Sequence, residues 1–317
     1  NASLKLYDSR DGLIEQVNFR HGLTSFPPNM IFGDSDHDGF GEMYFFTLSH
    51  DSVFLAFMEP LGQDKFTAHE RLIDRVGNAG ETIDFTAGSG SDPLKDMNLD
   101  GFNDLVFYVL ARFSITPRQV YVYDIHQDTI RRSGSFGSNI NQLKVADLDR
   151  DGLFEVMGDN ATRGNTRDSM RLMYGDSCAW LMAYDHELKF LFDPVEFPSY
   201  GVKLDVRPFL TGDSGYIAVL YRNLGVAADP PAILLFDTRG KLIRKKVFNV
   251  EDRSLLSGLM SGEPADYGNL YVLYRDGRVE QYNSHLEKMD VHHVDKAIGG
   301  DLYHADLDAD GHNEIIF

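Results

Sequence analysis

The chain has 317 residues, of which 43% are hydrophobic, and its 49 acidic and 30 basic residues give a formal net charge of -19. The 22 Phe and 15 Tyr provide material for a large core of β-forming side chains and exclude a disordered chain. The negative charge repels phosphate backbones and anionic membrane surfaces, so we expect no nucleic acid partner. Multivalent cations are the partners that this charge favours. No apolar run approaches the roughly 20 residues of a membrane helix, and we expect no direct membrane insertion.

Hairpins recur along the chain from its first residues. Each candidate combines an aromatic-rich strand, a polar turn and, in the clearest copies, a second strand; the candidates lie at residues 4–14, 53–66, 120–124, 181–185, 233–240 and 279–283. Alternating side chains and Asp, Gly or Asn turns predict β-hairpins.

A second element, an acidic loop followed directly by an apolar strand, occurs four times. The loops span residues 34–42, 96–104, 147–155 and 306–314, and each has an Asp at position 1, acids or Asn at 3 and 5, Gly at 6 and an acid at 9. Their starting points are 62, 51 and 159 residues apart, and 159 is three times 53. A period near 53 therefore predicts two decayed copies in the last interval, and residues 212–215 and 263–268 retain the turn and the following strand.

Six loops alternating with six hairpins predict a closed repeat architecture. The chain begins with a hairpin and stops after a loop and its strand, so joining its ends completes one repeat. This is how a β-propeller hides its edge strands. We therefore predict an all-β fold, a single β-propeller domain over residues 1–317 with six blades of about 53 residues, closed by strands from both termini. Seven blades are the alternative.

The acidic loops have the composition of calcium sites. Calcium takes six to eight oxygen ligands, and acids at positions 1, 3 and 5 of a tight loop converge on one point. The glycine at position 6 lets the carbonyl of position 7 join them, and the acid at position 9 completes the shell. The predicted ligands are Asp34, Asp36, Asp38, Phe40 and Glu42; Asp96, Asn98, Asp100, Phe102 and Asp104; Asp147, Asp149, Asp151, Leu153 and Glu155; and Asp306, Asp308, Asp310, His312 and Glu314, with carbonyls from Phe40, Phe102, Leu153 and His312.

An EF-hand shares the start of this pattern but requires an acid at position 12 and flanking helices. Position 12 here is Phe45, Phe107, Gly158 or Phe317, so an EF-hand is excluded. With a strand after each loop and a period near 53, the chain resembles the FG-GAP/VCBS repeat family, whose best-known members are the integrin α-subunit propellers. The loops at 147–155 and 306–314 match its pattern most closely. The resemblance implies a calcium-binding β-propeller, and it covers the whole chain in period and four of the six repeats in metal ligands.

We expect about four bound Ca²⁺ ions that form part of the fold, because gathered carboxylates repel one another without a cation. A regulatory ion and magnesium are the alternatives; magnesium fits less well because it prefers a rigid octahedron with retained waters. A structural ion of modest affinity favours a calcium-rich compartment, so we expect an extracellular, periplasmic or cell-surface location. No signal segment opens the sequence, and we expect any export signal to have been removed.

We find no catalytic motif: no Gly-x-Ser-x-Gly elbow, no phosphate-binding loop and no histidine set with zinc spacing. The expected function is a non-catalytic binding or scaffolding module that recognises a protein or glycan through one propeller face. A carbohydrate-active enzyme, a polysaccharide lyase or glycosidase on the same scaffold, is the alternative, as is a spacer without a ligand. The segments 77–95, 160–176 and 222–231 exceed the repeat and are candidate recognition loops or plain surface loops.

Overall fold

The computed structural model describes residues 2–7, 10, 12–23, 30–49, 51–60, 66–75, 85–90, 92–111, 116–162, 172–212, 214–225, 229–254, 256–261, 268–294, 303–305 and 314–316. The described residues form β-strands and one short 3-10 helix, η2 (Val250–Ser254). They belong to two compact units: residues 1–137, 141–143 and 165–173 form unit 1, and residues 138–140, 144–164 and 174–317 form unit 2. In this part of the chain no helix is long and apolar enough to cross a membrane.

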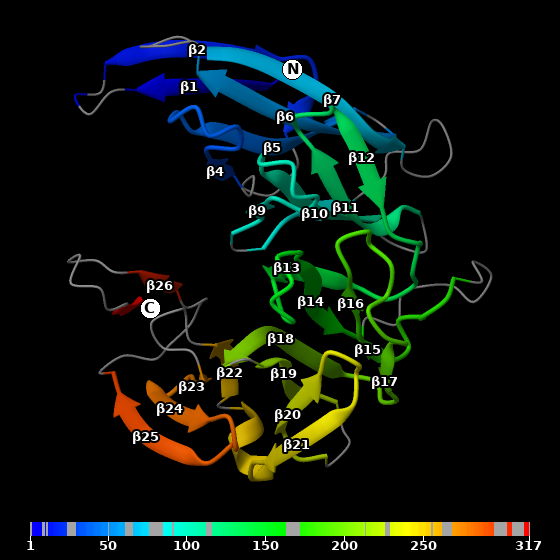
Figure 1. Ribbon diagram of the computed structural model, residues 1–317, viewed down its shortest axis with the longest axis vertical. Helices are drawn as coiled ribbons and strands as arrows, with labels where there is room; N and C mark the ends of the chain where they lie inside the picture. The colour runs from blue at the N-terminus through cyan, green and yellow to red at the C-terminus, as the bar shows by residue number, and fades with distance from the viewer. Residues whose placement is uncertain are drawn as a thin grey trace. The chain divides into compact units, whose positions relative to one another are not determined.

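Unit 1 contains one hairpin and two five-stranded antiparallel sheets (Figure 1). The hairpin pairs β1 (Ala2–Tyr7) with β2 (Leu13–Phe19). The first sheet has the order β3-β5-β6-β7, with β4 also paired to β5, and contains β3 (Gly22–Leu23), β4 (Ile31–Gly33), β5 (Glu42–Ser49), β6 (Ser52–Pro60) and β7 (Phe66–Arg75). The second has the order β8-β10-β11-β12, with β9 also paired to β10, and contains β8 (Phe85–Gly88), β9 (Leu94–Lys95), β10 (Asp104–Ala111), β11 (Arg118–Asp124) and β12 (Thr129–Arg132).

The central strands of unit 1 are buried on both faces, which explains their almost continuous apolar sequence. On one face of β5, Tyr44 and Phe46 belong to a core shared with Phe107 of the second sheet. On the other face, Phe45 packs against Phe19 of the hairpin, with ring centroids 4.8 Å apart. Because side chains alternate between the faces of a strand, a strand covered on both sides needs apolar residues at successive positions.

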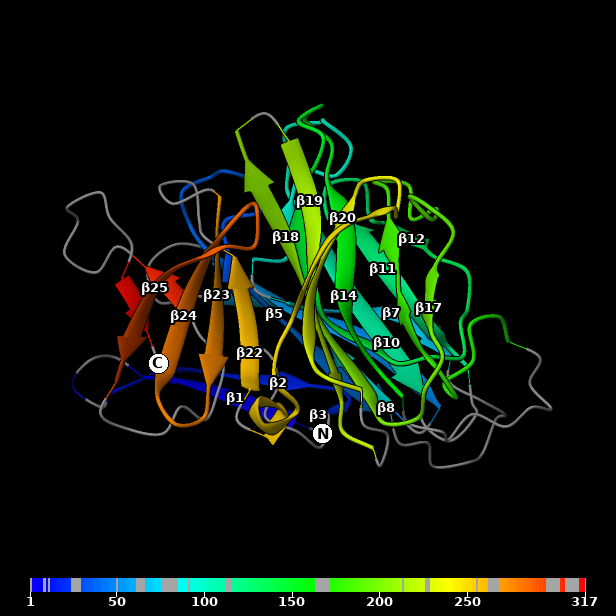
Figure 2. The same cartoon turned by 90° about the horizontal axis from the view of Figure 1, so that it is seen from below.

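Unit 2 contains a seven-stranded sheet, a four-stranded sheet and two strand pairs (Figure 2). The larger sheet has the order β13-β14-β18-β19-β20-β21, with β16 also paired to β14, and contains β13 (Ile140–Ala146), β14 (Glu155–Ala161), β16 (Ala183–Tyr184), β18 (Val202–Thr211), β19 (Ser214–Asn223), β20 (Ala232–Asp237) and β21 (Leu242–Val247). The smaller sheet follows chain order and contains β22 (Leu256–Ser261), β23 (Asn269–Tyr274), β24 (Arg278–Asn283) and β25 (Lys288–His293). The pairs are β15 (Ala179–Leu181) with β17 (Val195–Phe197), and β26 (Tyr303–Ala305) with β27 (Glu314–Ile316).

Unit 2 repeats the same two-sided burial. Along β19, Ile217 and Val219 enter one core and Ala218 and Leu220 enter another, and all four are fully buried. Charge is buried as well: Asp159 of β14 accepts hydrogen bonds from the backbone nitrogen of Val206, at 2.7 Å, and from Nη1 of Arg207, at 2.9 Å. The carboxylate is therefore paired with an opposite charge, as burial away from water requires.

Three hairpins share a turn that begins with an Asp or Asn at the end of β20 and β24 or directly after β16. In three hairpins the first turn residue, Asp185, Asp237 or Asn283, accepts hydrogen bonds through Oδ1 from backbone nitrogens two and four residues later, at 2.9–3.0 Å. A residue with φ near +60° to +74° closes each turn, and only one of the three is glycine: Leu188, Gly240 and Leu286. The side-chain hydrogen bonds stabilise a turn that Leu would otherwise disfavour.

Four-stranded antiparallel sheets in chain order are the blades of a β-propeller. The sheet β22–β25 has this form, as do the consecutive strands β18–β21 within the seven-stranded sheet, and the predicted fold class, all-β with propeller blades, is confirmed. The terminal strands form two separate pairs, β1 with β2 in unit 1 and β26 with β27 in unit 2. Their union into one closing blade, the count of six and the single domain over 1–317 stay predictions.

The sequence predicts that the segment 77–95 exceeds the repeat. For part of this segment the prediction is wrong, because that part belongs to a sheet. Residues 85–88 and 94–95 are β8 and β9, and both pair with β10 to form one edge of the second sheet. Two short pieces separated by Gly and Ser escape recognition because neither reaches the length of a strand pattern. Residues 160–161 and 222–223 likewise end β14 and β19, whereas 77–84, 163–171 and 226–228 lie outside the described residues, as do 213 and 262–267 of the decayed copies.

Burial on both faces makes the strand cores sensitive to truncation. We expect Leu204→Ala in β18, where the side chain is fully buried, to lower the free energy of unfolding by about 2–5 kcal/mol through lost contacts and a cavity. Leu242→Ala on β21, where 45% of the residue is exposed, is the matched control and should cost less than about 1 kcal/mol. Urea unfolding of both variants measures the difference, and equal losses would contradict the assignment of β18 to the core.

Candidate functional site

Three of the predicted calcium loops lie wholly in the described part of the chain, and each connects two neighbouring antiparallel strands of one sheet. The loop at 34–42 joins β4 to β5, the loop at 96–104 joins β9 to β10, and the loop at 147–155 joins β13 to β14. Each loop therefore occupies the same place in its sheet. Residues 306–313 of the fourth loop lie outside the described residues; Glu314 begins β27.

The three loops share one hydrogen-bond framework. The carboxylate at position 1 (Asp34, Asp96 or Asp147) accepts the backbone nitrogens of positions 5 and 6 at 2.9–3.1 Å. The carboxylate at position 5 (Asp38, Asp100 or Asp151) accepts the backbone nitrogen of position 7 at 2.8–3.0 Å. Loops of different sequence in two units thus fold the same way, because the shared acids bind the same backbone groups.

Two positions of each loop have positive φ. The glycine at position 6 has φ of 88–90° at Gly39, Gly101 and Gly152, a conformation that side chains disfavour. Position 4 has φ of 60–63° although it holds His37, Leu99 and Arg150. The sequence indicated the glycine but not position 4, where three unlike side chains hide a shared backbone conformation.

Positions 2 and 9 attach each loop to its sheet. Position 2 is Ser35, Met97 or Leu148, and all three are buried. Its backbone nitrogen donates to the acid at position 9, at 2.7 Å to Glu42, 3.2 Å to Asp104 and 2.7 Å to Glu155. In the first loop the Ser35 hydroxyl also donates to Glu42 at 2.6 Å and lies 2.8 Å from the Tyr44 hydroxyl. A buried carboxylate is therefore held at the floor of each loop.

The acids of two loops converge. Ligand oxygens of Asp34, Asp36, Asp38 and Glu42 lie within 4.8 Å of one another, as do those of Asp147, Asp149 and Asp151. Among the residues that the structure describes, no Lys or Arg nitrogen lies within the 4.0 Å of an ion pair from any of these carboxylates. The loop at 96–104 has an amide, Asn98, in place of one acid.

In two of the loops, burial and like charges disfavour ionisation of the acid at position 9. Burial raises the pKa of Glu155 to about 7; the hydrogen bond from Leu148 opposes this rise, and the charges of the other three loop acids add to it. Burial and the nearby charge of Asp124 raise the pKa of Asp104 to about 7, against the opposing charge of Arg131. Without a cation, the ionised state of these sites is therefore costly.

The donor set fits a hard divalent cation. Carboxylate oxygens are the ligands that calcium takes in proteins, and the acids that these two loops gather concentrate negative charge that a cation would neutralise. Asp34, Asp36, Asp38 and Glu42 would hold one ion, and Asp147, Asp149, Asp151 and Glu155 a second. The ion would neutralise the acids and stabilise the loop; this is structural chemistry and requires no reaction.

Several residues of the loops escaped sequence analysis. Asn103 joins the first two loops within unit 1, because its backbone nitrogen donates to the Ser35 carbonyl at 2.8 Å and its Nδ2 to the Asp34 carbonyl at 3.2 Å. Asp124, Gln127 and Arg131 of the β11–β12 hairpin contact the second loop. The only sequence signal for these three was their place in the following hairpin, because their pairing with the loop depends on how the sheet folds.

No family model matches the chain, and no curated protein does. It is similar to BBS1N in complex with ARL6DN in two crystals. In the lead-soaked crystal the identity is 10% over 90% of this chain and 87% of that chain, with a TM-score of 0.43. In the mercury-soaked crystal the identity is 10% over 93% of this chain and 76% of that chain, with a TM-score of 0.49. It is also similar to apo AztD from Citrobacter koseri, at 12% identity over 93% and 80%, with a TM-score of 0.31. Similarities this remote assign neither a family nor a function.

The raised pKa of Glu155 predicts a loss of stability with rising pH that calcium should offset. In chelator, the folded state holds its proton up to about pH 7, whereas the unfolded state releases it near 4.5, so the free energy of unfolding falls as pH rises between these values. Calcium binds the ionised form and should offset this loss.

Glu155→Gln isolates this contribution, because it removes the titration and keeps an acceptor for Leu148. At pH 8 we expect the variant to be more stable than the wild type in chelator and less stable in calcium, and the two to agree in chelator near pH 4. Denaturant unfolding at several pH values measures this, and parallel curves with no crossing would contradict it.

Proposed function

We propose that this chain is a calcium-stabilised, non-catalytic binding or scaffolding module. The observation that supports it most is the repeated loop framework, in which the same backbone hydrogen bonds present converging carboxylates in loops 34–42 and 147–155. A cation there neutralises charge that the fold concentrates, so its binding energy adds to the stability of the folded state. The framework also supports membership of the FG-GAP/VCBS family as part of the proposal.

Calcium is the proposed ion because the loops offer many carboxylate oxygens, whereas magnesium prefers a rigid octahedron with retained waters. Calcium sites of modest affinity fill where free calcium is high. The proposal therefore includes an extracellular, periplasmic or cell-surface location for the module.

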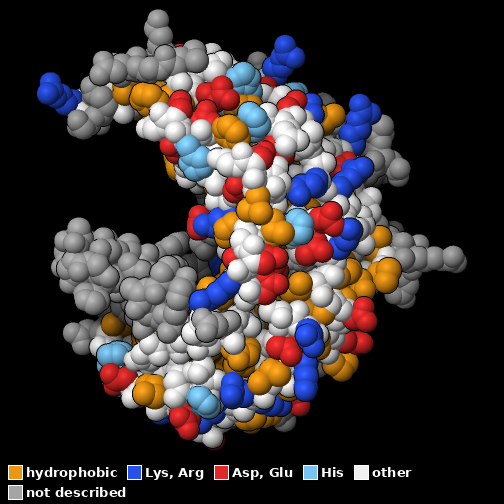
Figure 3. All heavy atoms as spheres, in the orientation of Figure 1, with side chains coloured by type: hydrophobic (Ala, Val, Ile, Leu, Met, Phe, Trp, Pro, Cys, Tyr) orange, Lys and Arg blue, Asp and Glu red, His pale blue; other side chains and the backbone are white. Residues whose placement is uncertain are grey.

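The proposed partner is a protein or a glycan. On the face drawn in Figure 3, acidic and basic side chains alternate and hydrophobic side chains form small groups between them. In unit 2, the ring of Tyr174 lies 5.1 Å from that of Trp180 and 5.2 Å from that of Phe190, and Phe190 is 36% exposed. Tyr174 lies within the candidate recognition segment 160–176. Exposed aromatic edges bind sugar rings and apolar side chains alike, which makes this aromatic group the first surface to test.

Thermal unfolding with and without chelator tests the calcium proposal. With free calcium at 100 times the dissociation constant, each ion adds about 2.7 kcal/mol, so two ions should raise the melting temperature by about 10 °C. We expect chelator to lower the melting temperature, calcium to restore it, and magnesium to restore little of it. A melting curve that chelator leaves unchanged would contradict the proposed calcium binding.

The single tryptophan, Trp180, reports on the aromatic group. We expect a glycan selected from an array of defined oligosaccharides, or a bound protein partner without tryptophan, to change the Trp180 emission on titration. Phe190→Ser should weaken binding at least tenfold. Leu242→Ser, at a residue of β21 that is 45% exposed, is the control and should leave the affinity unchanged. Equal affinity of wild type and Phe190→Ser would place the partner on another face.

A further inference from the structure

The loop at 96–104 follows the shared framework, but its carboxylates have different partners. Oδ1 of Asp100 accepts the backbone nitrogen of Phe102, as its counterparts do in the other loops. Its Oδ2 accepts two further donors, Nδ2 of Asn98 at 3.2 Å and Nε2 of Gln127 at 3.3 Å. In the described residues, Oδ2 of Asp38 and of Asp151 has no such donor. Among the described residues, side-chain amides therefore bond the carboxylate at position 5 only in this loop.

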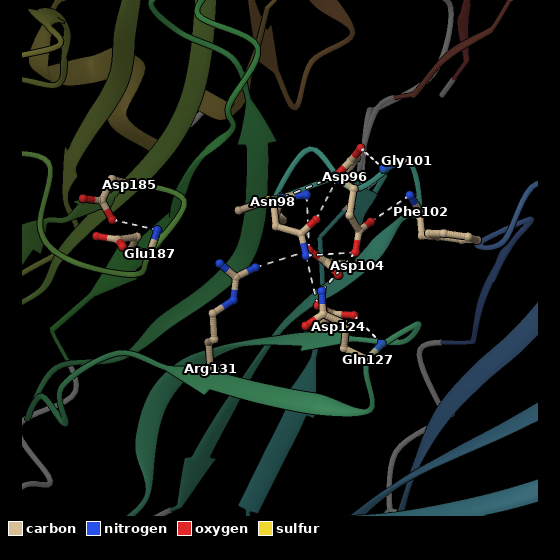
Figure 4. A network of polar contacts seen from close by, with 12 residues as sticks. Asp96, Asn98, Gly101, Phe102, Asp104, Asp124, Gln127, Arg131, Asp185 and Glu187 are labelled. Atoms are coloured by element: carbon tan, nitrogen blue, oxygen red, sulfur yellow. Dashed lines mark hydrogen bonds and ion pairs between the residues drawn. The ribbon is translucent and has the colours of Figure 1, made fainter.

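A basic side chain also reaches this loop. Nη2 of Arg131, on β12, lies 3.3 Å from Oδ2 of Asp104, whose side chain is only 2% exposed (Figure 4). The register of β11 and β12 pairs Val122 with Arg131, and this pairing fixes the position of the Arg131 backbone in the sheet. A guanidinium beside a buried carboxylate supplies positive charge to this loop.

Two more contacts attach the loop to the β11–β12 hairpin. Asn98 donates through Nδ2 to Oδ2 of Asp124 at 2.9 Å, which turns the amide nitrogen toward a second acid (Figure 4). The ring of Phe102 stacks on His126 with centroids 3.9 Å apart and an angle of 4° between the planes. Loop 96–104 is thus held by side chains of the following hairpin, whereas in loop 147–155 the acids Asp147, Asp151 and Glu155 accept hydrogen bonds from backbone amides of the loop itself.

We propose that Arg131, with the amides of Asn98 and Gln127, replaces the cation in loop 96–104, so that this loop keeps its conformation without calcium. Loops 34–42 and 147–155 then hold the ions. This inference rests on the proposed calcium binding. A divalent ion in the second loop would lie close to the guanidinium, and repulsion between the two positive charges would weaken its binding.

Matched substitutions at position 5 test the assignment, because Asp38, Asp100 and Asp151 are all exposed and make the same backbone contact. Bound calcium per chain is measured by mass spectrometry after equilibrium dialysis. We expect Asp38→Ala and Asp151→Ala each to lose one ion relative to the wild type, and Asp100→Ala to lose none. Loss of one ion by Asp100→Ala would overturn the inference and leave the calcium proposal intact, whereas a wild type without bound calcium would overturn both.

A gain of binding provides the second test. Arg131→Gln combined with Asn98→Asp removes the guanidinium and restores the acid set, so we expect one additional bound ion per chain. Arg132→Gln, on the same strand but paired with Asp74 at 3.1 Å, is the matched control and should leave the calcium count unchanged. In chelator, Arg131→Gln alone should lower the melting temperature more than Arg132→Gln does. Absence of an additional ion in the double variant would contradict the inference.

Discussion

The repulsion between carboxylates that each loop gathers is the constraint on which the candidate sites depend. The backbone of the loop draws the acids inward, because positions 1 and 5 bind amides within the same turn. The resulting charge must be neutralised by a proton, a metal ion or a basic side chain. The raised pKa of Glu155 reflects the first solution, the proposed calcium the second, and Arg131 the third. Repeats of one sequence pattern can therefore differ in their need for an ion.

The sheets position these loops through burial on both faces. Strands such as β5 and β19 pack apolar side chains into a core on each side, which fixes where the preceding loop ends. Position 2 of the loop adds to this, because Met97 and Leu148 are fully buried while the ligand candidates on either side of them are half-buried or exposed. The Asp-x-Asp spacing thus reflects the alternation of side chains at the end of a strand as well as the geometry of a ligand set.

Much of the fold and of two sites could be predicted from local pattern. Turn residues and alternation located the hairpins, and the described parts of β1–β2, β11–β12 and β24–β25 agree with the prediction. The short strands β8 and β9 could not be found, because their pairing with β10 and not their own sequence defines them. Likewise, the sequence around loop 96–104 did not predict its contact with Arg131. This residue lies 27 residues after Asp104 and reaches it only across the folded sheet.

By itself, the sequence determined the all-β class, the repeat and the conformation of the loops, since each depends on contacts between residues close together in the chain. Asp147, Asp151 and Gly152 lie within six residues, and their hydrogen bonds need no distant partner. Only the tertiary structure decided which loops are compensated by side chains from elsewhere. Charge compensation depends on distances between strands, and strand pairing brings together residues that the chain separates.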